Sequence, residues 1–143
     1  MSGSGQLPCH AVIHAVGPMF RGGFNGEEDC LHDTIMKCML ATAETGYTSI
    51  AFPAISTGIF HYPPKKATRV IVEAVKSYFD SHRKSSIKNV YLCHMSLDIV
   101  QMFSEAIGVI FPSAQSSSTV ARKPVPVARN GETSLFANPR MNF

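Results

Sequence analysis

Residues 49–64 limit the chain to folds that contain a strand–loop–helix unit, and they read Ser-Ile-Ala-Phe-Pro-Ala-Ile-Ser-Thr-Gly-Ile-Phe-His-Tyr-Pro-Pro. The apolar beginning predicts a buried strand, and the paired prolines predict the start of a helix. A loop of small residues beyond the carboxyl end of a strand commonly offers backbone amides to phosphate. Ser56 and Thr57 would add hydroxyl donors, and Gly58 has no Cβ to hinder a ligand. The stretch therefore predicts either a phosphate-binding loop or an ordinary strand–helix connection.

Apolar residues elsewhere recur with strand and helix periods in alternation. The predicted elements are a strand over 9–16, a helix over about 27–45, a strand over 48–52, a helix from Pro63 or Pro64, a strand over 89–95 and a helix from Ser96 to about 107. Asn25 or Gly26 can cap the first helix, and Gly46 can end it. The order β-α-β-α-β-α predicts an α/β fold with a sheet between helix layers.

The charge of the chain is unevenly distributed. Up to Phe111, nine basic residues balance nine acidic ones, so the net charge of +3 comes from the tail. A neutral globular part argues against a broad nucleic-acid surface. The 4 cysteines form no CxxC pair, which is typical of free thiols in a reducing compartment. Because the chain has neither a signal-peptide core nor an apolar run of about 18 residues, we expect an intracellular protein outside the membrane.

Two segments, in this order and separated by a helix, resemble the macrodomain, the ADP-ribose-binding module. Residues 9–18 read Cys-His-Ala-Val-Ile-His-Ala-Val-Gly-Pro, and residues 51–60 read Ala-Phe-Pro-Ala-Ile-Ser-Thr-Gly-Ile-Phe, followed by Tyr62 and Pro63. The sequence of these two segments is most similar to macrodomains of poly(ADP-ribose) polymerase relatives. The resemblance implies a three-layer α/β/α fold. We therefore divide the chain into a partial macrodomain, 1–111, and a Ser/Pro-rich tail, 112–143, which we expect to be disordered.

The resemblance also implies that part of a macrodomain is missing. Family members begin with further strands, which carry an acidic residue that reads the adenine amine, an Asn-rich segment near the distal ribose and a Gly-rich first phosphate loop. The eight residues before Cys9 cannot supply them. One of those strands lies inside the family's mixed sheet, so we expect two strand edges to face each other across a gap. Each unpaired buried amide or carbonyl costs about 1–3 kcal/mol. We therefore expect a sheet without its N-terminal strands, in a fragment, splice form or partial gene model.

The ligand-binding residues are assigned by the same resemblance. Ser56, Thr57, Gly58, Ile59 and Phe60 match the family's second loop, which holds the diphosphate and the distal ribose. Phe60 would face the ribose, and His61 stands where a small Gly is often found. Met95 falls where many members place an aromatic residue that stacks on adenine, and a thioether makes a weaker, less directional contact with a ring.

Other kinds of site find little support in the sequence. His10 and His14 would lie about 13 Å apart along a strand, too far to share a metal ion. Cys93 falls inside a strand, where a thiol is usually inert packing. Ser56 has no base near it in the sequence, so a hydrogen-bonding role is favoured over nucleophilic attack. We therefore predict no catalytic residue, no metal site and no cofactor.

These observations favour a binding module for ADP-ribose, free or attached to proteins, with affinity reduced by the missing segment. An ADP-ribosyl hydrolase is the enzymatic alternative, disfavoured because the family's first loop takes part in that reaction. A third possibility is a non-autonomous fragment of a larger mono-ADP-ribosyltransferase protein. Each of them predicts a location in the nucleus, the cytoplasm or both.

Overall fold

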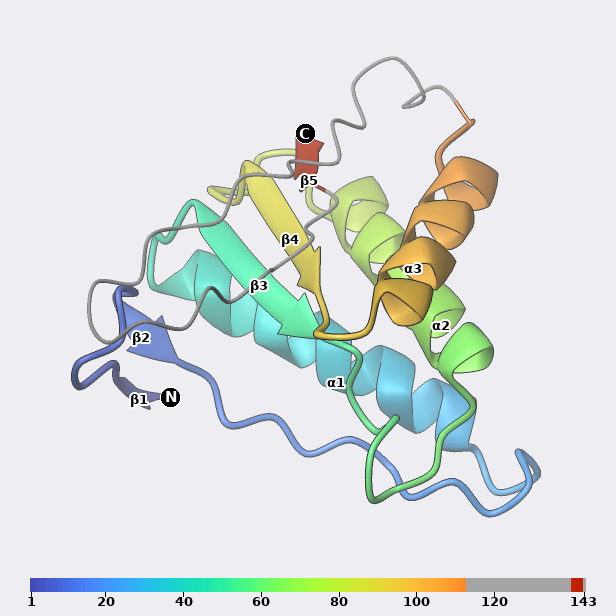
Figure 1. The fold of residues 1–143 in the computed structure, drawn as a ribbon. Coiled ribbons are helices and arrows are strands. Elements are labelled where there is room, and N and C mark those ends of the chain that lie inside the picture. Colours follow the sequence, from blue (N-terminus) through green and yellow to red (C-terminus); the bar gives the residue numbers. More distant parts are fainter. Residues whose placement is uncertain (113–139, 143) are drawn as a thin grey trace.

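The structure is a computed structural model that describes residues 1–112 and 140–142. Its elements follow one another along the chain as Figure 1 shows. They are β1 (Ser2–Gly3), β2 (Ala11–Val12), α1 (Glu27–Glu44), β3 (Ser49–Pro53), α2 (Pro64–Ser81), β4 (Asn89–Cys93), α3 (Leu97–Ile110) and β5 (Arg140–Asn142). The predicted α/β class and the alternation of strands and helices are confirmed. No helix in the described part of the chain is long and apolar enough to cross a membrane.

The main sheet has three strands in the order β3-β4-β5. β3 and β4 are parallel, with Ser49 opposite Asn89 and Pro53 opposite Cys93, whereas β5 is antiparallel to β4. A parallel pair needs a crossover connection, and α2 provides it. Because side chains alternate along a strand, Phe52, Val90 and Leu92 face the same side, and all of them are buried.

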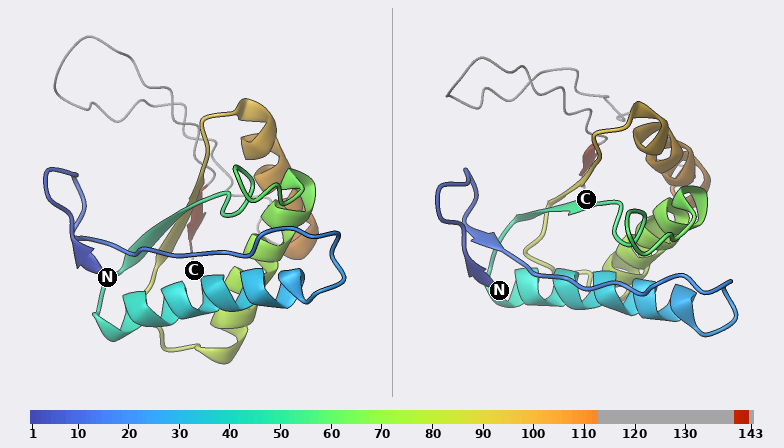
Figure 2. Two further views of the ribbon diagram at one scale, coloured as in Figure 1. Left: turned by 90° about the horizontal axis from the view of Figure 1, so that it is seen from below. Right: turned by 60° about the horizontal axis from the view of Figure 1, so that its bottom comes forward.

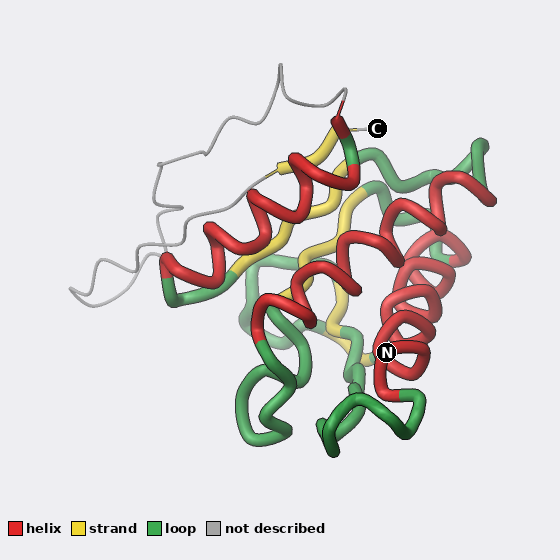
Figure 3. The backbone as a smooth tube through the Cα atoms, turned by 90° about the vertical axis from the view of Figure 1, so that its right-hand side faces the viewer, coloured by secondary structure: helices red, strands yellow, loops and turns green. Residues whose placement is uncertain are grey.

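All three helices pack on that buried side of the sheet. Figure 3 shows them next to one another in front of the strands, with α2 in the middle. One core cluster joins Ile35 of α1, Ile71 of α2 and Phe103 of α3 to the inward residues of β3 and β4. Alternate β3 residues on the other side, such as Ala51, are exposed.

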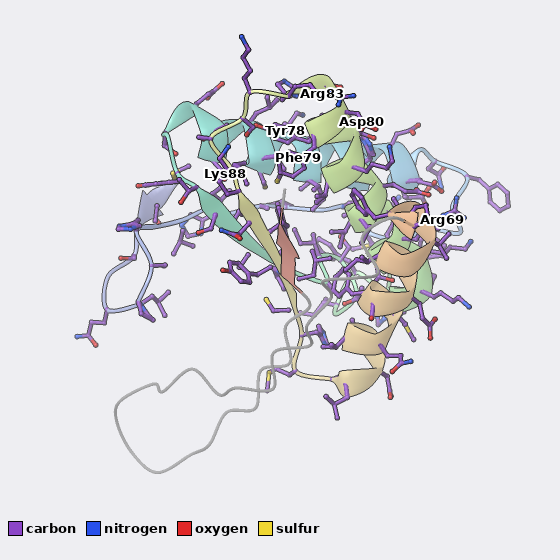
Figure 4. The ribbon with its side chains drawn as sticks, turned by 90° about the horizontal axis from the view of Figure 1, so that it is seen from above. Arg69, Tyr78, Phe79, Asp80, Arg83 and Lys88 are labelled. Atoms are coloured by element: carbon purple, nitrogen blue, oxygen red, sulfur yellow. The ribbon has the colours of Figure 1, made fainter. Side chains whose placement is uncertain are left out.

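The residues next to the helix ends explain where α1 ends and where α2 begins. α1 ends before Gly46, whose φ of 74° is the left-handed conformation that glycine adopts at low cost. α2 begins at Pro64, where the missing N–H is no loss. At its far end the Tyr78 hydroxyl pairs with the Ser85 hydroxyl at 2.8 Å, which ties α2 to the connection that leads through Lys88 into β4 (Figure 4).

The strand predicted over 9–16 is much shorter in the structure. Only β2 forms, and its partner is β1 rather than β3. Figure 2 shows the chain beyond β2 running beside α1, and the Thr34 hydroxyl donates to the Val16 carbonyl at 3.4 Å. A strand needs a partner for its amides, and β3 is separated from residues 9–13 by a cavity of about 1070 Å³. Residues on both sides of this pocket line it, so 9–13 and β3 do not pair there.

The structure describes only residues 140–142 of the tail beyond residue 112. Residues 113–139 and 143 lie outside the described residues, so disorder there stays a prediction. Arg140–Asn142 differ from the prediction, because they form β5 along the free edge of β4. An antiparallel pairing this short has no clear sequence pattern, which is why composition alone missed it.

Replacing Phe103 with Ala should lower the free energy of unfolding by about 3–5 kcal/mol, because the ring is fully buried among all the core elements. Urea denaturation of the full chain measures the change. Val109→Ala, on the exposed side of the same helix, is the matched control and should stay within about 0.5 kcal/mol of the parent. Equal losses in the two variants would contradict the placement of the core.

Candidate functional site

The candidate site lies where β3 and β4 end. Since the two strands are parallel and Pro53 pairs with Cys93, the segments that follow them emerge at the same edge of the sheet. The loop over residues 54–63, which we call the amide loop, joins β3 to α2, and residues 94–96 join β4 to α3 (Figure 1). The predicted residues Ser56–Phe60 and Met95 are thus brought to one edge.

Internal hydrogen bonds give the amide loop its shape. The Thr57 amide donates to the Ala54 carbonyl at 3.3 Å, and the His61 amide donates to the Gly58 carbonyl at 2.9 Å. The Tyr62 amide donates to the Ser56 carbonyl at 3.0 Å and closes the loop. The amides of the remaining residues in this arc have no acceptor among the described residues; they belong to Ser56, Gly58, Ile59 and Phe60. The loop therefore contains four backbone donors without an acceptor among the described residues.

Ser56 carries two unusual features at once. Its φ of 68° lies in the left-handed region that non-glycine residues rarely adopt. Its hydroxyl oxygen is buried and has no hydrogen-bond partner in the described part of the chain. A Cβ on Gly17 would lie 2.3 Å from that oxygen, so the chain at Gly17 presses closely on the loop. Strain and unsatisfied polar groups concentrate at functional sites, which makes this loop the first candidate.

The outer surface of the loop is open. A Cβ added to Gly58 would meet no atom within 4 Å, so space for a ligand exists directly against the backbone. Ile59 is 88% exposed and Met95 is 87% exposed. The Thr57 hydroxyl, in contrast, donates to the Ala54 carbonyl at 2.7 Å, so its hydrogen is used within the loop. Of the two hydroxyl donors that the sequence suggested, the Thr57 hydroxyl is used within the loop, and the Ser56 hydroxyl is buried without a partner among the described residues.

Aromatic packing supports the loop from one side. The Phe20 amide donates to the Phe60 carbonyl at 2.9 Å, and the Phe20 ring lies 5.0 Å from the ring of Tyr62. The Lys66 ammonium sits 5.8 Å from the centre of the Phe20 ring. Burial raises the pKa of the Tyr62 hydroxyl, and the carboxylates of Glu28 and Glu27 raise it further, so this hydroxyl stays neutral.

Sequence reasoning missed Gly17 and Phe20 as parts of this site. Gly17 could have been suspected, because a glycine at the end of an apolar run permits close approach of another backbone. Nothing in the sequence around Phe20 indicates that it would pack against Tyr62, 42 positions later. Such a contact depends on tertiary packing.

The other sequence candidates are engaged elsewhere. His10 stacks on Tyr47 with the ring centres 5.7 Å apart, and His14 pairs with the Ser2 hydroxyl at 2.7 Å. Burial raises the pKa of the Cys93 thiol, whose sulfur lies 3.5 Å from the Phe52 carbonyl oxygen. The described residues contain no group of three or more His, Cys, Asp or Glu side chains that could hold a metal ion.

Replacing Ser56 with Gly should raise the free energy of unfolding by up to about 1 kcal/mol, because glycine adopts a positive φ without strain and the unpaired hydroxyl is removed. Ser56→Ala is the matched control, since it removes the hydroxyl and keeps the strain. Denaturant melts of the three proteins measure both effects. A glycine variant less stable than the alanine variant would contradict the strained conformation.

Comparison with known proteins indicates which family the chain resembles. The sequence model of the macro domain matches residues 1–71. An O-acetyl-ADP-ribose deacetylase of Enterobacter sp. (strain 638) is 38% identical over 104 residues, which cover 73% of this chain and 57% of that protein. The enzyme of the same name from Escherichia coli (strain K12) is 42% identical over 79 residues, which cover 55% of this chain and 45% of that protein. The chain thus spans about half the length of these curated relatives.

Solved structures give the same fold. The Oceanobacillus iheyensis macrodomain with ADP matches with a TM-score of 0.65 and 24% identity, covering 76% of this chain and 55% of that one. The Trypanosoma brucei macrodomain in complex with ADP-ribose matches with a TM-score of 0.64 and 25% identity, covering 72% of this chain and 42% of that one. The arrangement of β3, β4 and the three helices is therefore a macrodomain arrangement, and the chain covers about half of each of these structures.

Proposed function

Because this chain is a macrodomain by fold and by the family model that matches residues 1–71, we propose that it binds ADP-ribose, free or attached to proteins, through the amide loop. The observation that carries this proposal is the set of four amides without an acceptor, those of Ser56, Gly58, Ile59 and Phe60. Backbone N–H groups held in one arc stabilise an anion without the side-chain entropy that a lysine would lose. A diphosphate has the charge and size to accept several of them.

The edge of the sheet also provides apolar surface for the rest of the nucleotide. Phe60 ends the arc of amides and would face the distal ribose, while Ile59 would cover the diphosphate from outside. Met95 follows β4 at the same edge and would contact the adenine. A thioether holds a ring less firmly than an aromatic residue, so the diphosphate would contribute most of the affinity.

A hydrolase is the second candidate, because the relatives in Enterobacter and Escherichia coli are named O-acetyl-ADP-ribose deacetylases. This chain spans only about half of those proteins, so the deacetylase activity is proposed for it and does not follow from the similarity. Incubation with O-acetyl-ADP-ribose and measurement of released acetate separates the two candidates. Release supports the hydrolase, and binding without release supports the binding module.

Three finer statements belong to the same proposal. The sequence resembles macrodomains of poly(ADP-ribose) polymerase relatives, whereas the relatives from Enterobacter and Escherichia coli are named O-acetyl-ADP-ribose deacetylases. A larger mono-ADP-ribosyltransferase protein would be a fitting parent for such a segment. ADP-ribosylated proteins in the nucleus or cytoplasm would then be its partners.

Replacing Gly58 with Glu should weaken ADP-ribose binding by at least about 100-fold, because the new carboxylate would occupy the open space at the loop and repel the diphosphate. Isothermal titration calorimetry with ADP-ribose measures the affinity. Val109→Glu adds the same charge at an exposed position near the far end of α3 and should leave binding within about twofold.

A smaller change at the same position separates contact from charge. Gly58→Ala should leave stability unchanged, because the new methyl group meets no protein atom within 4 Å, yet weaken binding by about tenfold if the ligand lies against the backbone. Full affinity in both Gly58 variants would contradict the amide loop as the binding site.

A further inference from the structure

Glu27, the first residue of α1, has its carboxylate buried, with 4% of the residue exposed. Oε1 accepts hydrogen bonds from the amides of Arg21, at 2.9 Å, and Gly23, at 3.2 Å. Oε2 accepts one from the amide of Asn25 at 2.7 Å. Together these bonds hold the segment 21–25 around a single side chain, an arrangement that we call the Glu27 clasp.

The clasp carries a full negative charge. Burial by itself would raise the pKa of the Glu27 carboxyl, but hydrogen bonds from the amides of Asn25, Glu27, Arg21 and Gly23 outweigh it and lower the pKa to about 2. Gly22 and Gly23 have φ values of 103° and 88°, which side-chain-bearing residues rarely adopt. The two glycines let the segment turn its amides inward toward the carboxylate.

The clasp leads directly to the amide loop. Phe20 immediately precedes the clasped segment, and it donates its amide to the Phe60 carbonyl and packs its ring on Tyr62. Gly17, three residues earlier, presses on the Ser56 hydroxyl. The short segment 17–20 therefore contacts the amide loop at Ser56 and at Phe60, the first and last residues whose amides have no acceptor.

We infer that Glu27 is a positioning residue for the amide loop: its carboxylate fixes segment 21–25, which holds Phe20 against Phe60 and Tyr62 and so keeps the four amides in one arc. This inference rests on the proposed function. Preorganised donors bind an anion more tightly because no free energy is spent on ordering them after the ligand arrives. Glu27 acts through Phe20 and touches no ligand.

Removing the charge of Glu27 should change the nucleotide affinity in opposite directions, depending on whether Glu27 acts by charge or by position. If Glu27 acted on the ligand by charge, its removal would relieve repulsion of the diphosphate and raise the affinity. If it acts by position, the loss of one carboxylate acceptor loosens the loop and lowers the affinity. The Gln side chain matches the size of Glu27 but turns an NH₂ group toward one of the amide donors.

The experiment compares Glu27→Gln with Glu28→Gln in the full chain by calorimetry, with ADP-ribose and ADP as ligands. Glu28 is the matched control, because it is the neighbouring carboxylate, is exposed, and accepts no hydrogen bond in the described part of the chain. We expect Glu27→Gln to weaken both ligands by the same factor, on the order of tenfold. Glu28→Gln should change neither by more than about twofold.

Hydrogen exchange by mass spectrometry adds a readout that does not require a ligand. In Glu27→Gln, the hydrogen-bonded amides within 20–25 and those of Thr57, His61 and Tyr62 should exchange faster, while those of 70–75 inside α2 keep the parent rate. Faster exchange in 20–25 alone would overturn the link to the amide loop. Equal or higher nucleotide affinity in Glu27→Gln would overturn the positioning role.

A second variant tests the same link if Glu27→Gln does not fold. Phe20→Ala leaves the clasp intact and removes the ring that packs on Tyr62, so it should weaken both nucleotides by several-fold and speed exchange in 56–62. Unchanged binding and exchange in Phe20→Ala would contradict the inference. If the parent chain binds neither nucleotide, the proposed function fails, and the exchange data alone decide whether the clasp holds the loop.

Discussion

Parallel pairing of β3 with β4 organises both the core and the candidate site. It places Phe52, Val90 and Leu92 on one buried face, where the three helices cover them. The same pairing makes the two strands end together, so the amide loop and the segment with Met95 emerge at one edge. The residues that stabilise the fold and those that would bind a nucleotide are thus positioned by a single set of backbone hydrogen bonds.

The site that results is built from backbone rather than from reactive side chains. Four amides of the amide loop have no acceptor among the described residues, Ser56 holds a strained conformation within the loop, and the backbone at Gly58 is open. Backbone amides without acceptors suit the binding of an anion. The supporting contacts come from the chain before α1, so the integrity of the site depends on residues that touch no ligand.

The sequence predicted the parts that depend on local pattern. The three helices and the strands β3 and β4 followed from apolar periodicity, and the loop between β3 and α2 followed from small residues between a strand and two prolines. Phosphate binding by that loop stays a prediction. The local sequence could not show that only β2 would form within 9–16. A strand needs a partner, and a pocket rather than a partner strand lies between residues 9–13 and β3. The Glu27 clasp was missed for a related reason: acidic residues at a helix start are ordinary, and only the burial of one of them reveals its amide partners.

Titration of the ¹⁵N-labelled full chain with ADP-ribose, followed by amide NMR, tests whether the amide loop binds the ligand. Binding through the amide loop predicts saturable shifts of the amides of Ser56, Gly58, Ile59 and Phe60, with smaller changes at the internally bonded amides of Thr57 and Tyr62. Saturable shifts confined to other parts of the chain, or no shifts at millimolar ADP-ribose, would contradict it.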